Sequence, residues 1–121
     1  MSWTGTMTCE VVNETGYEIT NVSAAHTWND KPSEKSVPVL GSGESFAFKF
    51  ECGAEGNDYW SVSFTDNRGR DYFRDQKQCN LEQDDYQSGS PVFINLLDPE
   101  QGFSIELPYS ASCLDNPYQR R

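Results

Sequence analysis

The chain has 121 residues, a length that suits one domain, and its net charge at neutral pH is −10. Such a charge excludes non-specific binding to nucleic acid or to bare anionic lipid, because both require a basic surface. The three Trp, six Tyr and seven Phe make a disordered chain improbable. No apolar run reaches the roughly 18 to 20 residues of a membrane helix, so we expect no transmembrane segment.

The N-terminal residues are polar and lack the apolar stretch of a signal peptide. We therefore expect a protein that either stays in the cytosol or has lost its signal peptide after secretion.

Alternation of apolar and polar residues predicts the strands of the first half. They are expected at 6–13, 17–28, 37–40 and 45–52. The apolar phase slips near Thr20 and Asn21, which indicates a bulge. The polar stretch 29–36 is expected to be a loop.

A hairpin centred on Trp60 opens the second half. Trp60, Val62 and Phe64 share one side of a strand, residues 66–69 supply turn chemistry, and a second strand returns from Arg70. Residues 74–89 are charged and show no helical stripe, although a helical turn would fit there. Further strands are expected at 91–97 and 103–107, followed by a tail at 108–121.

About seven or eight short strands, separated by turns every 8 to 12 residues, predict an all-β fold. We expect a single-domain antiparallel β-sandwich over residues 1–121, with residues 108–121 as the C-terminal tail.

The four cysteines contain no Cys-x-x-Cys pair, which disfavours a zinc site. In a secreted protein we would pair Cys79 with Cys113 and Cys9 with Cys52. In a reducing compartment, all four would be small buried hydrophobic residues.

No catalytic motif is present, and we expect no enzyme. The single histidine, His26, lies on the inward phase of its strand, and no Gly-x-Ser-x-Gly sequence accompanies it. The 19 acidic residues are too many for any one pair to be informative.

Oxygen donors in two turns are candidates for a calcium site. Asn57, Asp58 and Asp66 are the residues we single out, because calcium takes carboxylate and amide oxygens from loops. The alternative is that they are solvated turn residues. No cofactor other than calcium is expected.

Four aromatic residues are candidate ligand contacts, since flat rings stack on sugars and insert at membrane interfaces. They are Trp28, Tyr59, Tyr72 and Tyr86, and we expect Trp28 and Tyr59 to be exposed. Asn13-Glu14-Thr15 and Asn21-Val22-Ser23 both match the glycosylation acceptor pattern.

Several short motifs along the chain resemble a domain of nematode and fungal proteins that was noted in genes up-regulated when insulin-like signalling falls. The motifs are 11–16, 19–28, 58–60, 79–81 with 84–85, and 112–113. The resemblance spans nearly the whole chain and implies a β-sandwich, no established activity and a role in defence.

The first half is also similar in layout to the aegerolysins. The shared features are an opening strand, a turn at Asn13–Gly16, and a strand that ends in Trp28. This resemblance implies binding to membrane lipids and recruitment of a pore-forming partner, but it fades after Phe50.

The sequence therefore predicts a non-enzymatic recognition module of the lectin or cytolysin type, which binds glycans or membrane lipids. The alternative is an acidic protein-binding module, such as an inhibitor, a toxin component or an assembly subunit.

Overall fold

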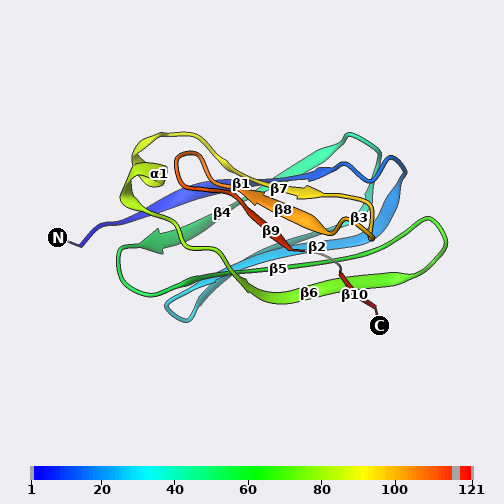
Figure 1. The fold of residues 1–121 in the computed structure, drawn as a ribbon, viewed down its shortest axis with the longest axis horizontal. Helices are drawn as coiled ribbons and strands as arrows, with labels where there is room; N and C mark the ends of the chain where they lie inside the picture. The colour runs from blue at the N-terminus through cyan, green and yellow to red at the C-terminus, as the bar shows by residue number, and fades with distance from the viewer. Residues whose placement is uncertain (1, 116–117, 121) are drawn as a thin grey trace.

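The computed structural model describes residues 2–115 and 118–120. It confirms the all-β prediction, because the chain forms a sandwich of two five-stranded sheets (Figure 1). The first sheet has the order β4-β1-β7-β8-β9 and comprises β1 (Thr4–Asn13), β4 (Ser45–Gly53), β7 (Val92–Leu96), β8 (Phe103–Glu106) and β9 (Cys113–Asp115). The second has the order β10-β6-β5-β2-β3 and comprises β2 (Ile19–Trp28), β3 (Lys31–Leu40), β5 (Asp58–Thr65), β6 (Asp71–Gln78) and β10 (Gln119–Arg120).

One pair of strands departs from the antiparallel expectation. β7 runs parallel to β1, with Cys9 opposite Val92 and Asn13 opposite Leu96. A parallel neighbour needs a crossover connection. Here residues 79–91 leave the second sheet after β6, include the short helix α1 (Gln83–Gln87), and enter the first sheet at β7 (Figure 1).

The prediction of a loop at 29–36 was wrong, because most of that stretch belongs to β3. Asn29 and Asp30 have φ values of 53° and 60° and connect β2 to β3 as a two-residue turn. Positive φ at both positions is the geometry of a type I′ hairpin, which matches the twist of the strands. Residues 31–36 are polar because β3 forms an exposed edge of its sheet, and the strand predicted at 37–40 is the second part of β3.

The predicted bulge and the predicted hairpin are both confirmed. The register of β2 against β5 shifts between Thr20 and Ser23, and Asn21 has a φ of 50°. β5 and β6 form the hairpin, closed by a turn in which Asp66 Oδ1 accepts hydrogen bonds from two backbone N–H groups.

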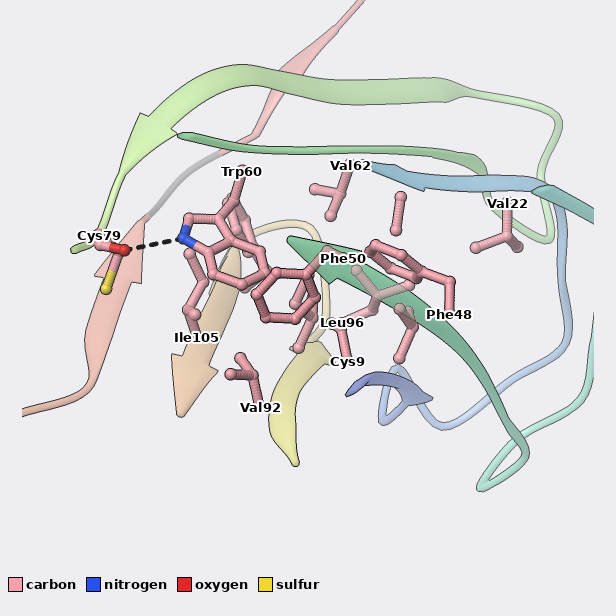
Figure 2. Close-up of a cluster of buried hydrophobic side chains, with 14 of the residues drawn as sticks. Cys9, Val22, Phe48, Phe50, Trp60, Val62, Cys79, Val92, Leu96 and Ile105 are labelled. Atoms are coloured by element: carbon pink, nitrogen blue, oxygen red, sulfur yellow. Dashed lines mark hydrogen bonds between the residues drawn. The ribbon is translucent and has the colours of Figure 1, made fainter. Parts of the chain in front are cut away.

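The core lies between the sheets and is centred on Trp60. Figure 2 shows the rings of Trp60 and Phe50 packed together between the two layers, with their centroids 5.2 Å apart. The indole N–H of Trp60 donates to the carbonyl oxygen of Cys79 at 2.9 Å, which satisfies its only polar group (Figure 2).

One of the two expected disulfides is present, between Cys79 and Cys113. The other pairing was wrong, since Cys9 and Cys52 are free and buried. Cys9 lies opposite Phe48, whereas Cys52 lies opposite Gly5, four residues along β1. At about 3.3 Å per residue this separation is about 13 Å, well beyond the roughly 7 Å that a disulfide spans between Cα atoms.

The expected tail supplies the last strand of each sheet. β9 pairs with β8, and β10 pairs with β6, while Tyr118 packs in the core. Residues 116, 117 and 121 of that tail, like Met1, lie outside the described residues. Within the described ranges, no helix is both long and apolar enough to cross a membrane.

Candidate functional site

A groove beside Tyr86 lies along the first sheet. It has a volume of about 350 Å³ and lies between β1 and the chain that leads from α1 into β7. We call it the Tyr86 groove, and its lining comprises Thr6, Met7, Thr8, Glu10, Tyr86, Gly89, Ser90 and Pro91. A volume of this size is in the range of ligand sites.

Tyr86 is held in place by the first residues of the chain. Its ring stacks on the ring of Trp3, with centroids 5.4 Å apart and planes 20° apart. It also lies against Gly5 so closely that a Cβ atom at Gly5 would collide with it. Glycine at position 5 is therefore required for the ring to sit there, and Tyr86 still exposes 37% of its surface.

The neighbouring residue, Asp85, fixes α1 to the sandwich. Its buried carboxylate accepts hydrogen bonds from the backbone N–H groups of Glu82, Tyr109 and Ser110 and from the Ser110 hydroxyl. Burial alone would raise the pKa of Asp85, but these hydrogen bonds, led by those from Ser110, outweigh it and hold the pKa below its ordinary value. A helix of five residues would not be stable alone, so this anchor sets the position of Tyr86.

The other groove residues supply hydrogen-bonding groups. Thr6, Thr8 and Ser90 bring hydroxyls, and Glu10 brings a half-buried carboxylate. The Ser45 hydroxyl donates to Oε1 of Glu10 at 2.8 Å, and Glu10 forms no ion pair with any residue that the structure describes. An aromatic ring, hydroxyls and an uncompensated carboxylate can bind a ligand that donates hydrogen bonds or carries positive charge.

The four predicted aromatic contacts do not form one site. Trp28 was expected to be exposed and is buried, because its ring covers Gly53 and its Nε1 donates to the Glu55 carbonyl at 2.7 Å. Tyr72 is also buried. Tyr59 is half-buried on β5 of the second sheet, so of the four only Tyr86 lies in the groove.

The three predicted calcium ligands are likewise separated. Asn57 and Asp58 lie at the start of β5, whereas Asp66 follows its end. Both carboxylates are buried, and each accepts hydrogen bonds from protein donors through both of its oxygens. Over the described part of the chain, no group of three acidic, His or Cys side chains is placed to hold a metal ion.

His26 belongs to the core and cannot meet a substrate. It is fully buried, lies between Phe50 and Trp60, and binds Oδ1 of Asp58 through Nε2 at 2.7 Å. Asp58 in turn accepts the backbone N–H of Leu81 through Oδ2. The pair therefore connects the core to the crossover segment near Cys79.

The two free thiols are not placed for nucleophilic chemistry. Burial raises the pKa of Cys52 to about 12, and the charge of Asp58 adds to the rise. Burial also raises the pKa of Cys9 well above its ordinary value, and the charge of Glu10 acts in the same direction. Both thiols therefore stay protonated at neutral pH, whereas a catalytic cysteine needs a lowered pKa.

The two glycosylation motifs differ in the accessibility of their asparagine. Asn13 is fully buried, and its Nδ2 donates to the carbonyls of Tyr17, Leu40 and Gly41, so no glycan could be attached there. Asn21 is exposed at the bulge of β2.

A second, more polar cleft of about 450 Å³ is lined by residues of the β5–β6 and β7–β8 turns. These turns lie at the end of the sandwich opposite α1 (Figure 1). The charged residues of this cleft, of both signs, are Arg68, Arg70, Asp98 and Glu100. Arg70 is already engaged, since its Nε donates to Oδ2 of Asp66 at 2.8 Å. The cleft therefore carries both positive and negative side chains, and one of its arginines is already paired. Such a lining favours no single class of ligand.

Sequence reasoning identified Tyr86 but missed the rest of the groove. Thr6, Thr8 and Glu10 are ordinary outward positions of a strand, and nothing in their spacing marks a site. The one available signal was the Ser-Gly-Ser-Pro sequence at 88–91, which ends any regular element just before β7.

The fold and site together define an acidic β-sandwich with an aromatic groove beside strand β1. No protein-family model and no curated protein matches the sequence. Among solved structures, the chain is similar to the NMR structure of the protein from Eubacterium rectale, with 27% identity over 87% of this chain and 90% of that chain. The TM-score of that superposition is 0.49.

Proposed function

We propose that this protein is a non-enzymatic recognition module that binds a segment of a partner protein in the Tyr86 groove. The observation that carries the proposal is the braced and exposed Tyr86 ring, which sits beside an uncompensated carboxylate in a chain of net charge −10. Tyrosine is enriched among residues that dominate protein interfaces, because its ring buries a large area and its hydroxyl can still bond.

Preorganisation supports the same proposal. Trp3, Gly5 and the Asp85 anchor hold the ring before any ligand arrives. A rigid anchor loses little conformational freedom on binding, so more of the contact energy appears as affinity.

The position of the histidine and the free thiols supports a binding role for the groove. The single histidine and both free thiols are buried in the core, away from any open surface. The groove is lined instead by an aromatic ring, hydroxyls and the carboxylate of Glu10, which suit hydrogen bonding and stacking.

The test is selection from a phage-displayed random peptide library on the wild-type protein. We expect enriched peptides whose affinity falls at least 10-fold in Tyr86→Ala, as it does when an interface anchor is removed. Gly5→Ala should produce a similar loss, because its methyl group displaces the Tyr86 ring without removing it. Tyr59→Ala is the matched control, a half-buried tyrosine on the other sheet that should leave affinity unchanged.

Glycan binding is the second candidate, favoured by the combination of one exposed ring with the hydroxyls of Thr6, Thr8 and Ser90 in the same groove. A glycan array and a liposome series, each with calcium and with chelator, are run beside the peptide selection. Binding to a sugar that is lost in Tyr86→Ala, with no peptide enriched, would replace the protein partner with a glycan. Binding to liposomes alone would favour the lipid-directed alternative.

A further inference from the structure

The first half of β1 has no strand on the side that faces the Tyr86 groove. β4 pairs with β1 from Thr4 to Val12, whereas β7 joins on the other side only from Cys9 onward. Alternate residues of a strand direct their N–H and C=O groups to opposite sides. Backbone groups between Thr4 and Thr8 therefore point toward the groove with no strand partner in the described ranges.

The groove follows this edge of β1. Three consecutive residues, Thr6, Met7 and Thr8, line it, although the Met7 side chain is buried in the core. Successive side chains of a strand point to opposite faces, so the groove meets the outward side chains of Thr6 and Thr8 and the backbone of Met7. All three residues belong to the half of β1 that β7 leaves unpaired.

The sequence before β7 explains why the edge is open. Gly89 has a φ of +74° and turns the chain, and Pro91 directly precedes the first residue of β7. Alternate residues of β7 face β1, so the next N–H toward β1 before Val92 would be that of Ser90. That N–H donates instead to the Ser88 hydroxyl at 3.1 Å, so the pairing does not continue backward along β1. The segment stands away from the strand, and the groove of about 350 Å³ occupies the space between them.

We propose that the open edge of β1 binds an extended peptide segment of the partner as an added strand, and that this segment carries a basic residue facing Glu10. The inference rests on the proposed function and specifies its binding mode and the chemistry of the partner. In such strand addition, backbone hydrogen bonds supply affinity and alternate side chains supply specificity.

Length and charge define the segment. The unpaired edge of β1 runs from Thr4 to Thr8, which is about 16 Å at 3.3 Å per residue. The partner segment therefore pairs over about five residues. Glu10 lies outward on β1 at one end of this edge and lacks an ion pair within the described residues. Lysine or arginine there would complete a charge-assisted hydrogen bond, and the net charge of −10 would attract a basic segment from a distance.

The probes are blocked six-residue peptides that alternate lysine with valine, and glutamate with valine. Two further versions of the lysine peptide carry N-methyl groups on either the lysine amides or the valine amides. In an extended peptide only one of these two sets faces β1. By calorimetry we expect one methylated version to lose at least 10-fold in affinity and the other to stay within 2-fold of the parent. Amide hydrogen exchange should slow within Thr4–Thr8 when the parent peptide binds.

Two matched variants test the charge. Glu10→Gln should weaken binding of the lysine peptide by about 10- to 150-fold, in keeping with the loss of one hydrogen bond to a charged group. Glu34→Gln removes an exposed carboxylate from β3 of the second sheet and should have no effect.

Strand addition would be overturned if both methylated peptides bound as tightly as the parent peptide. It would also be overturned if the rate of amide hydrogen exchange within Thr4–Thr8 did not change when the parent peptide binds. Equal binding of the glutamate peptide would overturn the basic partner. If none of these probes binds while library-selected peptides still require Tyr86, the inference fails and the proposed function stands. If the library also yields nothing, the proposed function fails with it.

Discussion

Asp58 and Asp85 are buried carboxylates that hold irregular chain by accepting backbone hydrogen bonds. Asp58 binds the N–H of Leu81, and Asp85 binds those of Glu82, Tyr109 and Ser110. Neither position is distinguishable in the sequence from the many exposed acids around it. At the scale of single residues, then, these two acids define where the crossover segment lies, and hence where Tyr86 points.

Asp85→Asn is expected to destabilise the protein in a pH-dependent way. The folded-state pKa of Asp85 is lowered, so its ionised form stabilises the fold above the unfolded pKa of about 3.9, and that stability is lost as the pH falls through the folded pKa. The variant should lose about 1 to 3 kcal/mol at pH 7, because an amide cannot accept all four hydrogen bonds.

Urea unfolding of both proteins between pH 7 and pH 2 measures this difference, which should narrow as the pH falls below about 4. Asp84→Asn changes the exposed neighbour and should match wild type throughout. A gap between wild type and Asp85→Asn that stays constant down to pH 2 would contradict the assigned role.

His26→Ala is expected to cost about 3 to 5 kcal/mol of stability. The substitution leaves a cavity between Phe50 and Trp60 and removes the partner of the buried Asp58. Denaturant unfolding followed by Trp fluorescence gives the value. A stability within 0.5 kcal/mol of wild type, a margin typical of surface substitutions, would show that His26 is not a packing residue.

At the scale of elements, the Cys79–Cys113 disulfide joins the crossover segment to β9. It closes a loop with a sequence separation of 34 residues. A loop of that length corresponds to about 3 to 4 kcal/mol in the chain-entropy description. Cys79→Ser/Cys113→Ser should therefore unfold at correspondingly lower denaturant concentration.

Thiol titration provides the matching readout. The native protein should show no reactive thiol, because Cys9 and Cys52 are buried and burial raises their pKa. Unfolding without reductant should expose two thiols, and unfolding with reductant should expose four. Four thiols in the unreduced, unfolded protein would mean that the disulfide does not form.

Elements with a clean period of two could be predicted from the sequence, and those set by long-range pairing could not. Phe46, Phe48 and Phe50 marked β4, and the phase slip near Asn21 marked the bulge. The strand predicted at 37–40 is the second part of β3, but residues 31–36 of β3 escaped prediction because an edge strand is exposed on its outer side and these polar residues look like those of a loop. The parallel β1–β7 pair depends on where the crossover segment lands, and local pattern carries no such information.

Long-range contacts also explain why the candidate site could be predicted only in part. Tyr86 could be singled out as an aromatic residue in a polar stretch, but its neighbours Trp3 and Gly5 lie more than 80 positions away in the chain. Trp28 was misjudged because a polar turn follows it, while the glycines that accept its ring come from another strand and loop.

At the scale of the whole molecule, the outer edges of both sheets are protected and the edge beside the Tyr86 groove is not. β3 carries Pro32, Pro38 and charged residues, and it lies beside β4. The other two edge strands, β9 and β10, are only three and two residues long. Such features block pairing between copies, so the open half of β1 stands out as a place to receive a strand.

The most direct measurement is an amide chemical-shift titration of the isotope-labelled protein with a library-selected peptide. The account predicts shifts concentrated at residues 4–10 and 85–91, with the Trp3 indole N–H among them, and little change at Tyr59 and Tyr72. Shifts centred on the second sheet or on the cleft at the opposite end, with residues 4–10 unmoved, would contradict the claim that the Tyr86 groove is the recognition site.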